Sequence, residues 1–371
     1  MIYFDNSATS YPKPIGVYLK TAEAELLYSF NSGRGGYRQS VKAAEKIYCV
    51  RKKVAEMFNL DPNGVIFTKN CTEALNIAIK GTVNKDDRIL ISSLEHNSVS
   101  RVVHNLPYEY DIFDYSFDDD KTVESFKNKI TDNTRIVICT HASNVFGCIL
   151  PIRRIGEICK QKGIMFIVDA AQTAGTLSID MQKDNIDILC TAGHKGLMGN
   201  MGTGLLMINN VSVKPLLYGG TGSNSSDLVQ PSDKPEGFEA GTLNNSGILS
   251  LGAGIDYINN TGIDCIYRHE MSLCSYLYSE LEKNDNITLY TPQPEMHKSV
   301  AIISFNFSDY SSEKTAAILS DNGICTRAGF HCAPLAHKHF GTENRGTVRI
   351  SLGAFNKYDQ CIKFVEILKS I

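Results

Sequence analysis

The sequence predicts an α/β protein that has a large domain with a mostly parallel sheet and a smaller α+β domain. Short apolar runs alternate with helical patterns over the first two thirds of the chain, which is typical of a parallel sheet covered on both faces. A chain of 371 residues exceeds the size at which single hydrophobic cores stop growing, so two domains are expected. We place the large domain at residues 15–250 and the small domain at residues 1–14 and 251–371.

Composition argues against several classes of protein. A net charge of −3 without a cluster of Lys or Arg argues against nucleic-acid binding. The apolar runs are shorter than the ~20 residues that cross a bilayer, and the first residues lack signal-peptide features, so no membrane association is expected. The eleven cysteines form no CxxC pair and no Cys/His cluster with ligand spacing, which favours reduced thiols in a cytoplasmic protein without a metal site.

The N-terminal region is expected to begin with loops. Residues 5–14 are rich in Ser, Thr, Asn and Pro, which favours an extended or looped segment. Residues 31–36 form a glycine-rich loop that carries Arg34; a surface turn is the simpler interpretation, and an anion-contacting loop is the alternative. Apolar residues then recur on one face of a helix over residues 41–58.

Strands and helices alternate from there to residue 208. The expected strands are residues 65–68, 89–92, 135–139, 164–168, 186–190 and 204–208. Helices are expected at residues 72–80, where Thr72 is a natural N-cap, and at 152–162, where Gly163 marks the end. The free N–H groups of the helix that Thr72 begins would suit an anion, although a plain cap is the simpler interpretation.

Several polar residues follow these strands directly, namely Thr72, His96, Asn144, Asp169 and Lys195. In open parallel sheets, ligands bind beyond the carboxyl ends of the strands. These side chains are therefore expected to converge at one edge of the sheet and to form a single site.

The pattern changes after the sheet. Residues 218–235 are polar and rich in Gly, Ser and Pro, which indicates a long loop or mobile flap. An apolar helix at residues 248–258 leads away from the sheet. The elements expected beyond it form an α+β pattern: a helix at 266–281, a strand at 300–307, a helix at 313–319 and a strand at 347–352.

Three side chains together indicate the chemistry. Lys195 follows an apolar run, where desolvation can lower the pKa of its amine and free it as a nucleophile, although alone it would most simply be a turn lysine. Cys332 stands beside Arg327 and His331, positive neighbours that favour a thiolate, although alone it would most simply be a buried inert thiol. Together with Asp169 as a partner for a pyridinium, they indicate pyridoxal-phosphate chemistry on a sulfur substrate.

These residues resemble the class V aminotransferase superfamily and, more narrowly, the cysteine desulfurases and selenocysteine lyases. The most specific motifs are Asp169 with Gln172, the pair His194-Lys195, and the segment RAGFHCA that contains Cys332. The resemblance runs from FDNSA at residues 4–8 to VRISL at 348–352. It implies the fold of type I pyridoxal-phosphate enzymes, with a mostly parallel sheet of the seven-stranded type, and a homodimer with active sites near the interface.

The resemblance also implies roles in holding pyridoxal 5′-phosphate. Lys195 would hold the cofactor covalently and later move protons, Asp169 would pair with the pyridine nitrogen, and Gln172 would hydrogen-bond the phenolic oxygen. His96 would stack on the ring and act in catalysis. The remaining cofactor-binding residues would be Cys71, Thr72, Asn144, His194 and, from the neighbouring subunit, Thr242, with Thr72, His194 and Thr242 at the phosphate.

Further roles concern the substrate. Asn144 and Arg349 would hold its carboxylate, Arg349 through a bidentate fork, and Arg34 and Ala8 would add substrate contacts. Cys332 would attack the substrate sulfur and keep it as a persulfide.

One departure from the family concerns the cofactor phosphate. The family usually has Ser or Thr directly before Gly-His-Lys, and here that position is Ala192. A missing donor to a charged group costs about 1.5–3 kcal/mol unless Thr191 or water replaces it.

The function expected from this resemblance is conversion of L-cysteine to L-alanine, with persulfide passed to a small sulfur-acceptor protein for iron–sulfur clusters or thiolated nucleotides. The alternatives are a selenocysteine lyase or another C–S lyase, and a pyridoxal-phosphate-binding sulfur carrier with little turnover. Residues 334–344 form a short loop after Cys332, which resembles group II of the family and predicts slow turnover without an acceptor. His337 and His339 in this loop are expected to be solvated, with a contact to the acceptor as the alternative.

Overall fold

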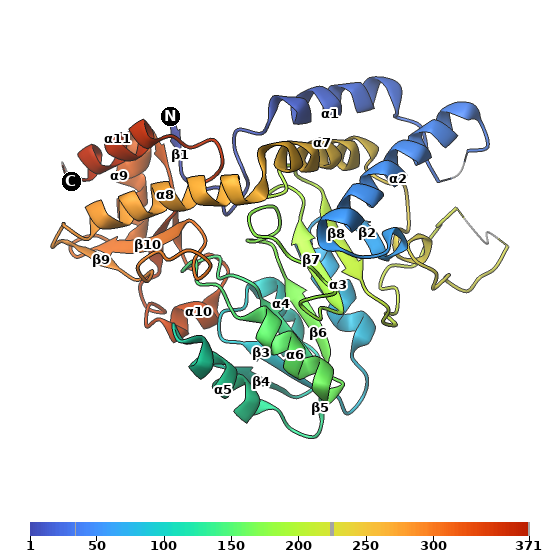
Figure 1. The fold of residues 1–371 in the computed structure, drawn as a ribbon, viewed down its shortest axis with the longest axis horizontal. Coiled ribbons are helices and arrows are strands. Elements are labelled where there is room, and N and C mark those ends of the chain that lie inside the picture. The colour runs from blue at the N-terminus through green and yellow to red at the C-terminus, as the bar shows by residue number, and fades with distance from the viewer. Residues whose placement is uncertain (34, 223–225, 370–371) are drawn as a thin grey trace.

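A seven-stranded sheet forms the centre of the larger part of the molecule (Figure 1). The computed structural model describes residues 1–33, 35–222 and 226–369. The strand order is β2-β8-β7-β6-β5-β3-β4; β8 is antiparallel to both of its neighbours, and the other pairs are parallel. The mostly parallel sheet of seven strands is therefore confirmed. The strands are β2 Val65–Thr68, β3 Arg88–Ser92, β4 Tyr110–Phe113, β5 Thr134–Thr140, β6 Met165–Asp169, β7 Ile188–Ala192 and β8 Gly204–Ile208.

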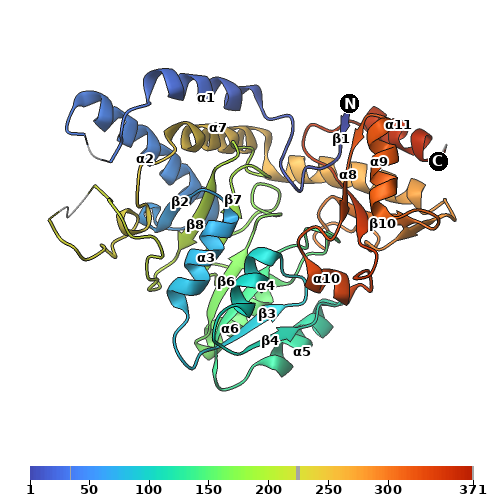
Figure 2. The ribbon, with the colours of Figure 1, turned by 180° about the vertical axis from the view of Figure 1, so that it is seen from behind.

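Helices cover both faces of this sheet. Buried side chains of α3 and α4 form one apolar layer with the sheet, and those of α2, α5, α6 and α7 form the other. Figure 1 shows α6 in front of the sheet, and Figure 2 shows α3 and α4 in front when the molecule is seen from behind. The helices are α1 Ile15–Leu27, α2 Arg38–Phe58, α3 Cys71–Thr82, α4 Asn97–His104, α5 Asp119–Lys129, α6 Ile152–Lys162 and α7 Asn245–Thr261, with short 3₁₀ turns at Pro62–Gly64 and Glu236–Phe238.

Local sequence explains why these helices form where they do. In α2, buried Ile47, Val54 and Phe58 repeat at helical spacing, so one stripe faces the core while charged side chains face solvent. Helix α6 ends at Gly163, whose φ of +64° is a left-handed conformation that glycine adopts without strain.

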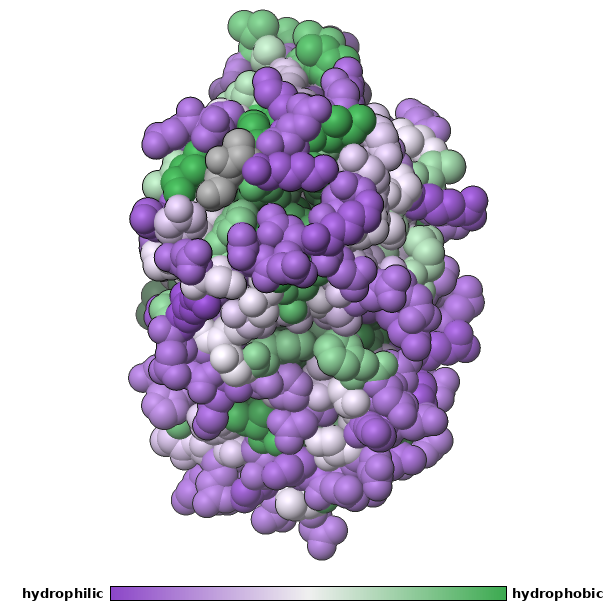
Figure 3. Space-filling model, turned by 90° about the vertical axis from the view of Figure 1, so that its left-hand side faces the viewer, coloured by the Kyte–Doolittle hydropathy of each residue, from purple (hydrophilic) through white to green (hydrophobic). Residues whose placement is uncertain are grey.

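A smaller unit carries both chain termini (Figure 1). Its sheet has the order β12-β13-β10-β9 and is antiparallel, and it has an apolar core of its own. The N-terminal strand β1 joins this unit by pairing with β11. Figure 3 shows that this end of the molecule presents a mostly hydrophilic surface. The elements are β1 Ile2–Tyr3, α8 Ile263–Leu281, β9 Ile287–Leu289, β10 Ile302–Phe307, α9 Ser312–Asp321, β11 Ile324–Cys325, β12 Arg327–Gly329, α10 Pro334–His339, β13 Thr347–Ser351 and α11 Tyr358–Leu368.

Some elements were not predicted from the sequence. Helix α1 packs on α7 while Ile15, Leu19 and Leu26 stay exposed, so its apolar pattern does not reveal a buried face. Helix α3 begins earlier than expected because Asn70, and not Thr72, is its N-cap: the Asn70 side chain accepts from the Glu73 N–H at 2.9 Å.

Two further points concern the whole chain. Helix α7 runs through residue 250, where the sequence analysis placed the domain boundary, and the division into the two proposed domains stays a prediction. Among the helices of the described residues, none combines the length and the apolar character that crossing a membrane requires.

Candidate active site

The carboxyl ends of β2, β5, β6 and β7 open into a cavity with an empty volume of about 510 Å³. Predicted site residues line it together, although they come from distant parts of the chain. They are Cys71, Thr72, His96, Asn144, Asp169, Gln172, His194 and Lys195.

Lys195 and Asp169 form the charged centre of this cavity. Asp169 is the last residue of β6, and Lys195 lies in the turn that follows β7. Burial lowers the pKa of the Lys195 amine below its usual range, while the nearby Asp169 and Cys71 oppose that shift. Burial raises the pKa of Asp169, whose carboxylate accepts from the Ala171 N–H at 2.9 Å and from the Cys71 thiol at 3.5 Å. The amine is thus brought closer to its neutral, nucleophilic form.

His96 stands beside them as the N-cap of α4. The Ser98 N–H donates to its Nδ1 at 3.1 Å, and the Ser98 hydroxyl lies 2.7 Å from the same atom. Burial, helped by the positive charge of Lys195, lowers the pKa of His96 to about 4. The ring is therefore neutral at pH 7, and because Nδ1 accepts, Nε2 carries the proton. Ser98 was missed from the sequence, although Val99 and Val103 at helical spacing were a signal for the helix that begins there.

The N-terminus of α3 offers an anion site at the same cavity. The N–H groups of a helix's first turn have no partner within the helix. His194 lies nearby, and its buried Nδ1 has no hydrogen-bond partner within the described part of the chain. Burial and the charge of Lys195 lower the pKa of His194 to about 4, so its ring is also neutral.

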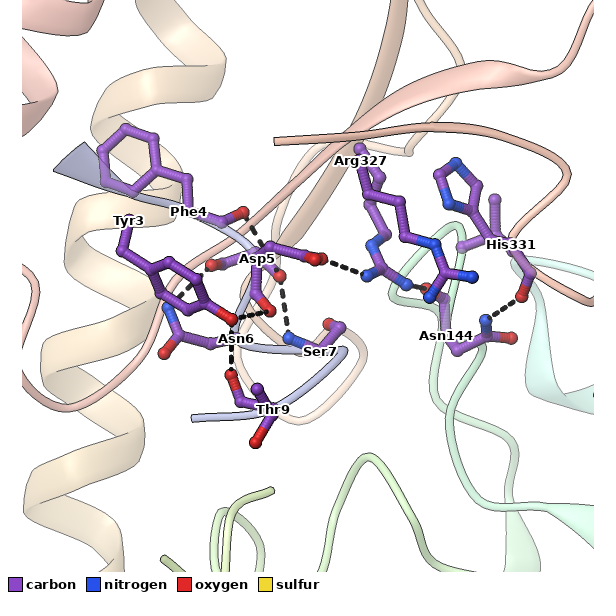
Figure 4. Close-up of polar contacts among 12 residues, drawn as sticks. Tyr3, Phe4, Asp5, Asn6, Ser7, Thr9, Asn144, Arg327 and His331 are labelled. Carbon is purple, nitrogen blue, oxygen red and sulfur yellow. Dashed lines mark hydrogen bonds and ion pairs between the residues drawn. The ribbon is translucent and has the colours of Figure 1, made fainter. Parts of the chain in front are cut away.

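Arg349 of β13 is fully buried behind the cavity. One of its terminal nitrogens, Nη2, lies 2.5 Å from Asp5, and Nη1 donates to the Asn144 carbonyl at 2.9 Å. Its Nε has no partner among the described residues. Figure 4 shows Asp5 and Asn144 with the contacts that each of them makes to this arginine. No sequence pattern indicated that Asp5 would neutralise this arginine, because 344 positions separate the two residues.

The Cys332 segment, residues 329–333, reaches the site from the small unit. Two hydrogen bonds hold its backbone against the larger unit. The Asn97 N–H donates to the Cys332 carbonyl at 2.7 Å, and the Asn144 amide donates to the His331 carbonyl at 2.8 Å (Figure 4). Gly329, His331 and Cys332 all have positive φ, of 96°, 48° and 58°. Two successive non-glycine residues in this region store backbone strain, which is common at functional sites. The Cys332 side chain is exposed, with Arg327 Nη2 at 3.9 Å from its Sγ.

The histidines near Cys332 differ from the sequence expectations. His331 is buried, its Nε2 donates to the Thr347 carbonyl at 3.0 Å, and burial holds its pKa far below the usual range. It is therefore neutral, and the expectation that it supplies positive charge to Cys332 was wrong. His337 of α10 is buried, and its Nδ1 lies 2.7 Å from the hydroxyl of Thr342, which follows the helix. The expectation of a solvated histidine was therefore wrong for His337. His339 is partly buried, with Asp114 at 3.7 Å.

Other predicted residues lie away from the cavity. Thr242 is exposed and lines a different surface depression, so within one chain it does not reach the cofactor cavity. Ala8 lies in the turn after β1, where its N–H donates to the Asp5 carbonyl. Arg34 lies outside the described residues.

Ala192 lines the cavity, whereas the Thr191 hydroxyl donates to the Ala170 carbonyl at 3.2 Å.

The chemistry of these donors fits pyridoxal 5′-phosphate. A buried carboxylate without a charged hydrogen-bond partner suits a pyridinium, and a desolvated lysine amine suits an aldehyde. An open helix N-terminus and the unpartnered His194 Nδ1 suit a phosphate.

Comparison with known proteins supports this conclusion. Residues 2–364 match the profile of the family described as aminotransferase class-V. The chain belongs to the class-V aminotransferase family. A probable cysteine desulfurase of Methanothermobacter thermautotrophicus is 33% identical and one of Pyrococcus abyssi is also 33% identical, each over all of this chain and 94% of the relative. The apo structure of a cysteine desulfurase from Thermococcus onnurineus superposes with a TM-score of 0.92 at 32% identity, over all of this chain and 94% of that one.

Within this family, the chain is similar over its full length to probable cysteine desulfurases and to a cysteine desulfurase of known structure. The family implies pyridoxal phosphate as the cofactor, in agreement with the donors in the cavity.

Proposed function

We propose that this protein is a pyridoxal-phosphate-dependent cysteine desulfurase that converts L-cysteine to L-alanine and holds the released sulfur as a persulfide on Cys332. The observation that carries the proposal is the position of Cys332. Hydrogen bonds from Asn97 and Asn144 hold the backbone around this exposed cysteine close to the cavity whose lysine and aspartate suit the cofactor. The full-length similarity to cysteine desulfurases supports it.

The residues of this chain would divide the work between binding, proton transfer and sulfur transfer. When bound, the cofactor would withdraw electrons from the substrate's α-carbon. Arg349 would hold the substrate carboxylate, with its unpartnered Nε as an available donor, and Asn144 would border the same place. The Lys195 amine would remove and return protons, and its lowered pKa supports that use.

The sulfur step would use the Cys332 thiolate. Its Sγ would attack the substrate sulfur, so that an S–S bond forms while the bond between that sulfur and the β-carbon breaks. The electron pair of the broken bond would stay with the carbon, which is then protonated to give alanine. Arg327 Nη2 lies 3.9 Å from Sγ, so a cation would stand beside the attacking sulfur.

The test is the Cys332→Ala variant, assayed for alanine, sulfide and protein-bound persulfide with L-cysteine. We expect cofactor binding to be unchanged, because Cys332 is not among the residues that line the cofactor cavity. Turnover should fall by several factors of ten, each worth about 1.4 kcal/mol of barrier. The matched control is Cys265→Ala, which removes another exposed thiol. Normal persulfide formation in Cys332→Ala would rule out the proposal.

We also propose that the protein works as a homodimer and delivers sulfur to a small acceptor protein. Exposed apolar side chains at Leu217, Tyr218, Leu228 and Val229 support a covered surface, and the exposed position of Thr242 supports a contact made only across subunits. Sedimentation should give twice the chain mass, with Leu228→Asp shifting it toward a monomer. A monomer in the unmodified protein would contradict this part of the proposal.

The short segment after Cys332 supports the part of the proposal that concerns an acceptor protein. Helix α10 fills residues 334–339 of this segment and packs His337 into the protein, which leaves little free chain to carry a persulfide away. We expect slow turnover with cysteine alone and acceleration by a thiol reductant or an acceptor protein. A fast rate that neither additive changes would contradict this expectation.

A further inference from the structure

A second cavity lies on the other side of Lys195. It has an empty volume of about 440 Å³ and shares Lys195 and Gln172 with the cofactor cavity. The N-terminal arm, the turn after β6, helix α8 and strand β10 enclose it. Nothing in the proposed reaction uses this space, yet its lining contains an ionisable side chain.

Glu270 of α8 points a buried carboxyl at this cavity. The residue is 6% exposed, and none of the described residues forms a hydrogen bond or an ion pair with it. Burial raises the pKa of its carboxyl to about 8. A buried carboxylate without a partner is costly, so the carboxyl either keeps a proton or binds a cation.

Two hydroxyl groups that line the same cavity are also buried and lack a hydrogen-bond partner among the described residues. Ser7 and Thr176 are buried, at 7% and 8% exposure, and their hydroxyls have no hydrogen-bond partner in the part of the chain that the structure describes. These hydroxyl oxygens and the carboxyl oxygens of Glu270 line one cavity and form no hydrogen bonds with one another, so all of them are available to a ligand there. Carboxylate and hydroxyl oxygens are the kind of ligand that small hard cations take.

The charge of the site selects the kind of cation. One carboxylate balances one positive charge, whereas protein sites for Ca²⁺ usually combine several carboxylates with other oxygens. The nitrogen and sulfur ligands that transition metals favour do not predominate in the lining. We propose that this cavity binds a monovalent metal cation, K⁺ or Na⁺, on the carboxylate of Glu270 and the hydroxyls of Ser7 and Thr176.

The position of the cation gives it a structural role. Ser7 belongs to the arm whose Asp5 holds Arg349, and its carbonyl accepts from the Gln172 amide at 3.3 Å. Thr176 belongs to the turn after β6, and Glu270 belongs to the small unit. A bound ion would join these three segments beside the Lys195 turn and would stabilise the folded protein.

Other ionisable groups near Glu270 do not replace the cation. Tyr267 and Cys274 lie on the same helix, Cys361 of α11 faces Cys274, and Lys195 borders the cavity from the large unit. Burial raises the pKa of the tyrosine and of both cysteines, so these groups are neutral at pH 7. In the described part of the chain, no cationic side chain forms an ion pair with Glu270.

The first test is thermal unfolding of the cofactor-loaded protein in KCl, NaCl and choline chloride at equal ionic strength. We expect a melting temperature about 2 °C or more higher in KCl or NaCl than in choline chloride. Because a proton competes with the cation for Glu270, the difference should be larger at pH 8.5 than at pH 6.5. Equal melting temperatures in all three salts at both pH values would overturn the proposal.

Variants and crystals locate the effect. Glu270→Gln should remove the dependence on the metal cation, and Glu366→Gln, which alters an exposed glutamate of α11, should keep it. If Glu270→Gln fails to fold, crystals of the unmodified protein grown in RbCl decide the matter. An anomalous peak in the cavity beside Glu270 is expected, and a cavity that holds only water would overturn the proposal.

Discussion

Two regions supply the reactive groups of the proposed site. They are the floor of the cofactor cavity, which contains Asp169 and Lys195, and its rim, which is the Cys332 segment, and they are held in place in different ways. On the floor, Asp169 and Lys195 stand at the ends of neighbouring buried strands, so the sheet's register fixes them. At the rim, Cys332 is exposed and sits on a backbone with positive φ, fixed by hydrogen bonds from residues more than 180 positions away.

This difference indicates what each region can tolerate. Burial tunes the floor, because the pKa values of Lys195 and Asp169 shift through desolvation. The rim depends on a few backbone contacts from distant segments, and the exposure of Cys332 suits a thiol that must present its sulfur to an acceptor.

The largest effect is expected at the floor. Lys195→Ala should lower the rate of alanine formation about 10³-fold or more, because it removes both the covalent attachment and the proton-transfer group. The matched control is Lys80→Ala, which changes an exposed lysine at the end of α3. Turnover within tenfold of normal in Lys195→Ala would show that the proton moves through another residue.

The two regions also differ in how far the sequence predicted them. The floor could be predicted because its residues follow apolar strands directly, so pattern and chain direction place Asp169 and Lys195 together. The rim could not: the ion pair of Asp5 with Arg349 and the contact of Asn97 with Cys332 are set by packing between distant segments. Helix α1 was missed because Ile15, Leu19 and Leu26 stay exposed, so its pattern shows no buried face. Helix α4 was missed although Val99 and Val103 repeat at helical spacing, because it is only eight residues long.

A second prediction tests whether water is excluded from the protein interior at the cavity floor, using the buried carboxyl of Glu95. Glu95 is fully buried between β3 and β5; Ser92 and the Thr140 N–H both donate to its Oε1. Burial raises its pKa to about 8, so the folded protein holds a proton that the unfolded chain releases above its ordinary pKa of 4.5. Its contribution to stability is thus complete below pH 4.5 and is lost as the pH rises through 8.

Glu95→Gln, which needs no proton, should therefore gain stability relative to the unmodified protein as the pH rises from 5 to 8. The gain should approach about 1.4 kcal/mol per pH unit, measured by denaturant unfolding at each pH. Glu124→Gln, at an exposed position of α5, should show no such trend. A stability difference that stays constant over this range would mean that water reaches the floor.

A third prediction loosens the rim and leaves the floor intact. Asn97 is the first residue of α4, a position that accepts proline, and His96 before it has φ −72° and ψ 157°, which proline also accepts. Asn97→Pro removes the N–H that donates to the Cys332 carbonyl, whereas Asn97→Ala keeps it. We expect persulfide formation to slow about tenfold in Asn97→Pro relative to Asn97→Ala, with cofactor affinity unchanged. Equal rates would show that this bond does not position Cys332.

The smallest effect is expected at Ala192, where the floor lacks a hydroxyl that the family usually has. Ala192 lines the cavity, and Thr191 cannot replace the missing donor because its own hydroxyl is engaged by the Ala170 carbonyl on the other side of the strand. Ala192→Ser should tighten cofactor binding about threefold to tenfold, since the helix N-terminus and His194 already serve the phosphate. Turnover should change little, because the phosphate is remote from the reacting carbon. Reconstitution of the apo-protein with pyridoxal phosphate measures the affinity, and Thr191→Val, which removes the engaged hydroxyl, is the control that should leave it unchanged. If Thr191→Val weakens binding while Ala192→Ser does nothing, the threonine serves the phosphate and the floor lacks no donor.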